Sequence, residues 1–204
     1  MENKHPLDLY EFYRQILAPT ENEALVDSLV SHSSIVTRQK GDVIFSPEGG
    51  GSSSYFLLNG VMKTCVLSPD GTENTLGYFF QPGTGYTMNE ETIEATQLWC
   101  KAVTRCVLVE LSPGLFDLAE DHPELWKKLV LAWRPFYFGM MGKLRAGYTL
   151  NAKDRYLWFV KKYGPIVDII PQNEIALYLG IAPQSLSRIR TELAEEGGVD
   201  IEDR

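Results

Sequence analysis

The sequence is poor in cysteine and histidine and has no long apolar run. Its 204 residues include 3 cysteines and 3 histidines. No apolar stretch approaches the roughly 20 residues that a membrane-spanning helix needs, and the first residues lack the charged and then apolar pattern of a signal peptide. These absences speak against a membrane protein and a secreted one, so we expect a cytoplasmic protein.

The cysteines and histidines form no pattern that holds a metal. They are Cys65, Cys100 and Cys106, and His5, His32 and His122. No two cysteines have the Cys-x-x-Cys spacing of a metal or redox site, so we expect reduced thiols and neither a disulfide framework nor an iron–sulfur cluster. The histidines lie far apart in the sequence and are expected to be structural or on the surface, with a haem ligand among them as the open alternative.

The most informative segment lies near the C-terminal end and has the pattern of two short amphipathic helices joined by a sharp turn. Apolar residues recur at helical spacing on both sides of the turn. They are Ile175, Leu179, Ile181, Leu186, Ile189 and Leu193. Gly180 lies where the chain must turn, and small Ala176 lets the second helix approach the first. Pro183 suits the first turn of the second helix, whereas Ala182 is a poor N-cap. This pattern predicts a helix-turn-helix.

The outward face of the second predicted helix carries side chains that can read DNA. It presents Gln184, Ser187 and Arg188 at a spacing of i, i+3 and i+4. Arginine can bond guanine twice, glutamine can bond adenine twice, and serine can bond a base or a phosphate. These three residues are candidates for contacts to base edges, and Ser185 and Arg190 for contacts that position the helix. A helical hairpin with a solvated polar face is the alternative.

The net charge of −8 is an argument against DNA binding unless the charge is counted where contact would occur. Residues 151–192 hold six basic and four acidic side chains, so the predicted reading segment is mildly basic. Residues 1–150 hold 12 basic and 18 acidic side chains, and the residues from Leu193 onward hold five acidic ones and one arginine. We expect an affinity for DNA that is modest and sensitive to salt.

Between Ser34 and Leu111 the sequence changes to short runs of β-forming residues separated by turn signals. The expected strands cover residues 43–45, 55–58, 61–67, 76–80, 98–103 and 107–109. Residues 59–60, Asn-Gly, mark one turn, and residues 68–71, Ser-Pro-Asp-Gly, mark another. The pattern predicts a compact antiparallel barrel built of hairpins.

A long helix is predicted between these strands and the helix-turn-helix. Pro123 suits its first turn, and large apolar residues then recur with alternating gaps of four and three, as in the seam of a coiled coil. The seam residues are Trp126, Val130, Trp133, Tyr137, Met140 and Leu144. We favour a homodimer held by this helix, because a two-fold dimer can place two reading helices on half-sites about one DNA turn apart. A single buried helix is the alternative, and Pro135, Gly139 and Gly142 are expected to kink or loosen it.

A further helix should precede the helix-turn-helix, capped by Asn151 and ending near Gly164. Its expected core residues are Tyr156, Leu157, Phe159 and Val160. Beyond residue 196 only a short acidic segment follows. A β-hairpin wing after the helix-turn-helix is therefore expected to be abbreviated or missing.

The segments from Pro171 to Ala176 and from Leu186 to Arg190 together resemble the DNA-binding motif of the Crp/Fnr superfamily of bacterial transcription regulators. Residues 40–44 and 55–61 resemble the glycine-marked turns of the cyclic-nucleotide-binding β-roll. The resemblance implies a β-roll sensor, a dimerisation helix and a C-terminal DNA-binding domain. It also implies double-stranded DNA and a second copy of the chain as partners, with RNA polymerase as a further candidate.

The resemblance does not extend to the residues that bind cyclic AMP. In the superfamily's pocket a Gly-Glu segment meets phosphate and ribose, and an arginine beside a small hydroxyl residue meets the cyclic phosphate. Here no glutamate follows Gly85, and Thr96 and Gln97 stand where the arginine and its neighbour are expected. We therefore do not expect cyclic AMP as the effector. An unknown small effector in contact with Tyr86, Thr96, Gln97 or Trp99 is one interpretation, and a role of these residues in barrel packing and loops is the other.

The whole sequence predicts an α+β protein of three parts. Residues 1–121 form an antiparallel β-roll sensor with N-terminal helices, residues 122–149 the dimerisation helix, and residues 150–204 the helix-turn-helix domain. The predicted function is sequence-specific, DNA-binding regulation of transcription without a response to cyclic AMP. The alternative is a ligand-binding or protein-interaction module whose DNA-reading domain has degenerated. An enzyme is not expected, because no nucleophile–base motif, phosphate loop or metal-ligand spacing occurs, and no cofactor or metal is predicted.

Overall fold

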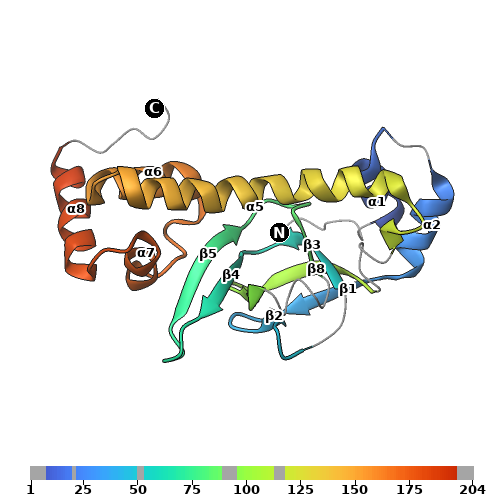
Figure 1. The fold of residues 1–204 in the computed structure, drawn as a ribbon, viewed down its shortest axis with the longest axis horizontal. Coiled ribbons are helices and arrows are strands. Elements are labelled where there is room, and N and C mark those ends of the chain that lie inside the picture. Colours follow the sequence, from blue (N-terminus) through green and yellow to red (C-terminus); the bar gives the residue numbers. More distant parts are fainter. Residues whose placement is uncertain (1–7, 20–21, 50–52, 89–95, 113–117, 197–204) are drawn as a thin grey trace, which may run out of the picture. The chain divides into compact units, whose positions relative to one another are not determined.

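The structure, a computed structural model, describes residues 8–196 except 20–21, 50–52, 89–95 and 113–117. Helices precede and follow the strands along the chain (Figure 1). The chain divides into two compact units, Met1–Met62 with Phe79–Pro135, and Lys63–Tyr78 with Phe136–Arg204. The second unit thus joins a hairpin from the strand region to the C-terminal helices. The three-part division with boundaries after residues 121 and 149 stays a prediction.

The first unit begins with two helices and continues with antiparallel strands. Its elements are α1 (Leu9–Leu17), α2 (Glu23–Ser31), β1 (Ser33–Arg38), β2 (Val43–Phe45), β3 (Ser53–Asn59), β6 (Gly85–Met88), β7 (Trp99–Ala102) and β8 (Cys106–Leu111). Strands β1, β8, β3 and β6 form one sheet in this order, and β2 pairs with β7. Every one of these pairings is antiparallel, as the hairpin pattern of the sequence predicts.

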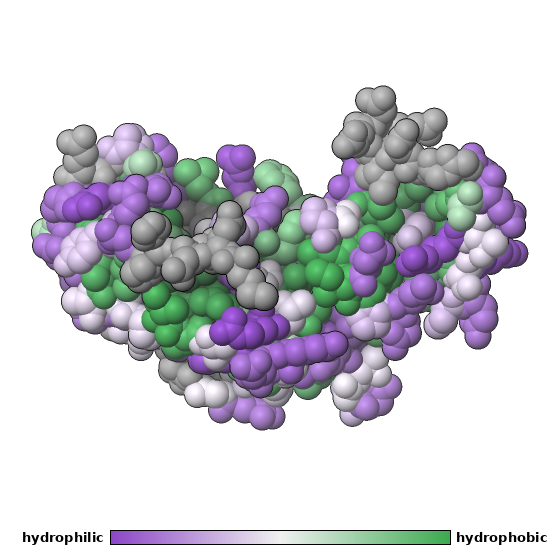
Figure 2. Space-filling view, turned by 180° about the vertical axis from the view of Figure 1, so that it is seen from behind, coloured by the Kyte–Doolittle hydropathy of each residue, from purple (hydrophilic) through white to green (hydrophobic). Residues whose placement is uncertain are grey.

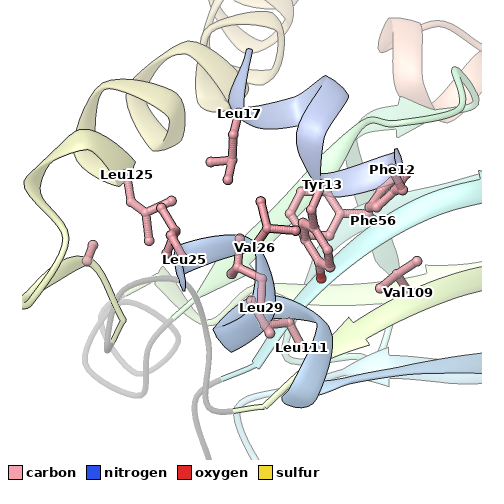
Figure 3. Packing of buried hydrophobic residues seen from close by; sticks show 11 residues of the cluster. Phe12, Tyr13, Leu17, Leu25, Val26, Leu29, Phe56, Val109, Leu111 and Leu125 are labelled. Carbon is pink, nitrogen blue, oxygen red and sulfur yellow. The ribbon is translucent and has the colours of Figure 1, made fainter. Parts of the chain in front are cut away.

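The core of the first unit lies between its two N-terminal helices and the sheet (Figure 3). It consists of Phe12, Tyr13, Leu17, Leu25, Val26, Leu29, Phe56, Val109, Leu111, Ala119 and Leu125. The rings of Phe12 and Tyr13 meet the ring of Phe56 edge to face, with centroids 5.6 and 6.0 Å apart. This aromatic contact packs α1 directly on strand β3.

The second unit contains a hairpin and the C-terminal helices. Its elements are β4 (Met62–Leu67), β5 (Glu73–Phe79), α6 (Ala152–Tyr163), the 3-10 helix η1 (Gly164–Ile166), α7 (Gln172–Leu179) and α8 (Pro183–Glu195). The backbone N–H of Ser68 donates to the carbonyl of Thr72 at 3.0 Å, and Gly71 has a φ of +82°. The turn that the sequence predicts at residues 68–71 is therefore confirmed.

The long helix is α5 (Pro123–Thr149), which begins at the predicted proline. It is a single helix, so Pro135 does not end it. Its large exposed apolar side chains are those of Trp126, Leu131, Tyr137, Phe138, Met141, Leu144 and Tyr148. Figure 2 shows apolar areas between the polar ones on the surface of the molecule. A helix with this much apolar side chain in solvent has a surface suited to a partner.

Candidate nucleic-acid interface

The predicted helix-turn-helix is formed by α7 and α8. Gly180 ends α7 with φ +63° and ψ +42°, the left-handed conformation that favours glycine. The N–H of Ile181 donates back to the carbonyl of Ala176 at 3.0 Å, which closes the turn. Pro183 lies in the first turn of α8, and Ala182 provides no side-chain cap. The local signals in the sequence are confirmed one by one.

The apolar stripe of both helices forms the core of this part of the second unit. Its buried members are Ile175, Ala176, Leu179, Leu186, Ile189 and Leu193. In α6, Tyr156 and Phe159 are buried as expected, and the Asn151 side chain caps the helix by accepting from the N–H of Asp154. Leu157 and Val160 are only half-buried, so the core takes a narrower face of α6 than the sequence suggests.

The opposite face of α8 is open to solvent. Gln184, Ser187 and Arg188 are exposed, whereas Ser185 and Arg190 are half-buried. This division agrees with the roles that the sequence suggests, since base contacts need a protruding side chain and phosphate contacts can be made from the flank. The five residues share one helix that is packed through Leu186 and Ile189, and their assignment to DNA stays a prediction.

Arg188 already has an acidic neighbour on its own helix. Its Nε lies 3.6 Å from Oε1 of Glu192, one turn further along α8, and its side chain is 75% exposed. An exposed pair of this kind contributes little free energy, so phosphate or a guanine edge can take the guanidinium from it. Nearer the end of the helix, Lys153 of α6 binds Glu196 at 2.8 Å. Acidic side chains therefore border the reading face at its C-terminal end.

A half-buried polar cluster fastens the β4–β5 hairpin to α7. Oε1 of Glu174 accepts from Nζ of Lys63 at 3.0 Å and from the hydroxyl of Tyr78 at 2.7 Å. Lys63 also binds Glu73 at 3.0 Å. Burial acts to lower the pKa of Lys63, but the hydrogen bonds and charges of Glu73 and Glu174 outweigh it, and the pKa is raised. The β4–β5 hairpin thus binds α7, the first helix of the helix-turn-helix, through a charged contact.

Sequence reasoning did not find this cluster. Lys63 and Glu174 are 111 residues apart and belong to segments that carry no shared motif. The signal available was weak: in a strand with apolar neighbours, a lysine such as Lys63 needs an acidic partner if it is to be buried. Nothing in the sequence indicates that the partner comes from α7.

The residues proposed for an effector differ in burial, and their role stays a prediction. Tyr86 is buried, with its ring stacked on Phe45 at 4.8 Å and edge-on to Phe79 at 5.4 Å. Thr96 and Gln97 are exposed, and Trp99 is half-buried in β7. Tyr86 therefore packs in the interior of the first unit, as its alternative interpretation has it. Residues 89–95, with three glutamates, lie outside the described part of the chain.

Three of the residues expected in the dimer seam of α5 are exposed to solvent. Trp126, Tyr137 and Leu144 are 44%, 54% and 52% exposed, whereas Met140 is half-buried. The side chains of Val130 and Trp133 lie outside the described residues. The exposed stripe also includes Met141 and Tyr148, at 42% and 84% exposure. Beyond the predicted seam, apolar exposure therefore extends to the end of α5.

Several other expectations concern the rest of the chain. Cys65, Cys100 and Cys106 are buried, and none of them forms a disulfide with another of the three. Within the described residues, no three histidine, cysteine or acidic side chains are grouped so that they could hold a metal ion.

No helix in the same part of the chain is long and apolar enough to cross a membrane. The acidic segment after residue 196, where a wing was expected to be reduced or missing, lies outside the described residues.

Comparison with known proteins finds transcription regulators. No protein-family model matches the chain. It is 28% identical over 175 residues to the nitrogen fixation regulation protein FixK of Bradyrhizobium diazoefficiens, a match that covers 79% of this chain and 72% of that protein. Among solved structures it is similar to FixK2 from Bradyrhizobium japonicum, with a TM-score of 0.69, 16% identity and coverage of 81% of this chain and 86% of the other.

A second solved structure, a putative transcriptional regulator of the Crp/Fnr family from Eubacterium rectale, has a TM-score of 0.70 at 16% identity. The match covers 86% of this chain and 85% of the other. At these identities the structural likeness concerns the fold, a combination of antiparallel strands and C-terminal helices. Together with the matching regulator sequence and the helix-turn-helix seen in α7 and α8, it supports membership of the chain in the Crp/Fnr superfamily of transcription regulators.

Proposed function

We propose that this regulator binds double-stranded DNA in a sequence-specific way through α8. The observation that carries the proposal is the geometry of that helix. Leu186 and Ile189 are buried and fix its orientation on α7, while Gln184, Ser187 and Arg188 extend from the opposite face. A helix of 13 residues with this polarity matches the second helix of a DNA-binding helix-turn-helix, whose exposed face enters the major groove.

We further propose that the protein acts as a homodimer formed along α5. Four exposed apolar side chains with gaps of four, three and four support this pairing, since they repeat at the period of a coiled-coil seam. They are Tyr137, Met141, Leu144 and Tyr148. A two-fold dimer supplies two copies of α8 for a palindromic site.

The proposal includes an effector other than cyclic AMP and a location in the cytoplasm. Thr96 and Gln97, which stand in place of the arginine and its hydroxyl neighbour, offer no cation to a cyclic phosphate. The FixK relative is named for the regulation of nitrogen fixation, and we carry over from it only the activity of a transcription regulator. RNA polymerase is the partner through which such a regulator would act.

The experiment is a binding measurement at fixed salt. DNA duplexes are selected from a random pool by the purified protein, and the affinity for the enriched sequence is compared with that for a random duplex of equal length. Specific regulators exceed their non-specific affinity by about a thousandfold or more. We expect a palindromic enriched site and a clear preference for it. Equal affinity for both duplexes would favour a module whose reader has degenerated.

A further inference from the structure

The ion pair between Arg188 and Glu192 on α8 uses one particular nitrogen of the guanidinium. Nε of Arg188 lies 3.6 Å from Oε1 of Glu192, one turn further along the helix. Side chains of a helix lean towards its N-terminal end, so the carboxylate of Glu192 approaches Arg188 from behind. A guanidinium also has donors on Nη1 and Nη2, and these two nitrogens can bond O6 and N7 of a guanine together. The contact with Glu192 therefore does not occupy the nitrogens that can read a base.

Both members of this pair reach solvent on the exposed side of α8. The side chain of Arg188 is 75% exposed and that of Glu192 is 48% exposed. The next carboxylate along the helix, that of Glu196, is bound by Lys153 of α6 at 2.8 Å and so has a cation of its own. Any acceptor that binds the terminal nitrogens of Arg188 therefore comes close to the negative charge of Glu192.

A guanine edge and a phosphate respond differently to that charge. O6 and N7 of guanine are neutral acceptors, whereas each phosphate of the DNA backbone carries a full negative charge. Although the pair with Arg188 is weak, the carboxylate stays one turn from the guanidinium when an acceptor binds, and two like charges brought together in an interface repel each other. The Debye length is about 10 Å at 0.1 M salt, so a contact this close is poorly screened. Glu192 therefore disfavours phosphate at Arg188 more than it disfavours a guanine edge.

We propose that Glu192 is a positioning residue that turns Arg188 towards a guanine edge and repels phosphate from it. The proposal rests on the proposed binding of DNA by α8 and adds the residue that makes this binding selective. Non-specific binding is made by phosphate contacts, so repulsion by Glu192 weakens it, while a base contact by the oriented guanidinium is retained. Specificity is a ratio of two affinities, and it rises through a repulsive element as well as through an attractive one.

The first test needs no DNA and measures, by NMR relaxation of the full chain, the order parameter of the Nε–H bond of Arg188. We expect Glu192→Gln to lower this order parameter, because the neutral amide attracts the guanidinium less than the carboxylate does. Glu195→Gln, which removes the same charge nearer the end of α8, is the matched control and should leave it unchanged. Both positions are exposed, so both variants keep the fold. Equal order parameters in the wild type and Glu192→Gln would overturn the proposal.

The second test compares the affinity for the selected duplex with that for a random duplex at one salt concentration. We expect Glu192→Gln to raise the affinity for the random duplex by about threefold or more without raising that for the selected one, so that the ratio of the two falls. Glu195→Gln should change both affinities by the same factor. If the wild type prefers the selected duplex and Glu192→Gln leaves the ratio unchanged, this proposal alone is wrong. A wild type without any preference would refute the proposed function, and this proposal with it.

Discussion

At the scale of residues, Glu174 helps to fix the position of α7 on the β4–β5 hairpin. Its carboxylate joins Lys63 of β4 to Tyr78 of β5, and the side chains of Lys63 and Glu174 are only 11% and 20% exposed. A hydrogen bond to a charged group contributes more than a neutral one, and a buried ammonium that loses a carboxylate is left poorly paired. The position of α7 thus depends on a residue whose carboxylate bonds the β4–β5 hairpin.

We expect Glu174→Gln to lower the free energy of unfolding by about 1 to 2 kcal/mol, because the amide keeps the shape but not the charge. Urea denaturation measures the change. Glu195→Gln, an exposed carboxylate on α8, is the matched control and should alter stability by less than about 0.5 kcal/mol. If both variants lose the same stability, the Glu174 cluster does not hold the hairpin to α7.

Lys143 should give the protein a pH-dependent stability. Burial lowers its pKa from 10.5 in the unfolded chain to about 8 in the folded protein. Between these values the unfolded chain holds a proton that the folded protein does not, so the free energy of unfolding rises with pH. We expect the wild type to gain stability relative to Lys143→Met between about pH 7.5 and about pH 9.5 in urea titrations. If the free energy of unfolding changes with pH by the same amount in both proteins, burial does not lower the pKa of Lys143.

At the scale of elements, the turn between α7 and α8 depends on Gly180. Its φ of +63° is unfavourable for a residue with a Cβ, although the nearest atom to such a Cβ, Nη1 of Arg155, is 3.7 Å away. We expect Gly180→Ala to cost about 1 kcal/mol in thermal or chemical unfolding. Gly147→Ala, a glycine in a helix, is the control and should gain up to about 1 kcal/mol. A neutral Gly180→Ala would mean that the turn relaxes to another conformation.

Helix α5 is the element on which dimerisation is proposed to depend. Leu144 is 52% exposed and belongs to the apolar stripe with Tyr137, Met141 and Tyr148. We expect Leu144→Glu to weaken self-association by about tenfold or more in sedimentation velocity, since a charge would be buried against the partner helix. Arg145→Glu, the next residue along the same helix, should have a smaller effect. A monomeric wild type would contradict the proposed dimer outright.

The elements also show what the sequence could and could not predict. The helix-turn-helix was predictable because its signals are local: Gly180 for the turn, Pro183 for the start of α8, and Leu186 and Ile189 for the buried face. Strands β2, β3, β4, β5, β7 and β8 were predictable to within a few residues for the same reason, whereas β1 and β6 had no counterpart among the predicted runs. The contact between Lys63 and Glu174 depends on how two distant segments pack together. Neither the periodicity of apolar residues nor the turn signals indicate which distant segments will meet.

The residues of the sites divide in the same way. Exposure of Gln184, Ser187 and Arg188 follows from the helical period and was predicted. The effector residues were inferred from their match to a pocket whose key arginine this chain lacks; Tyr86 packs in the interior, and the role of all four stays a prediction.

At the scale of the whole molecule, the distribution of charge bears on the proposed binding of DNA. The net charge is −8, while residues 151–192 carry a small excess of basic side chains. In the proposed complex, attraction to phosphate would be confined to residues 151–192, and much of the discrimination between DNA sequences would come from base contacts. Arg188, with its side chain 75% exposed on α8, is the residue best placed to supply them.

The most direct test of sequence reading by α8 is the specificity ratio of Arg188→Ala, the affinity for the selected site divided by that for a random duplex at one salt concentration. An arginine that bonds a guanine contributes about 1 to 3 kcal/mol of discrimination, so the ratio should fall by about tenfold or more. Arg105→Ala, an exposed arginine of the first unit, should leave the ratio unchanged. An unchanged ratio for Arg188→Ala would contradict base reading by this residue.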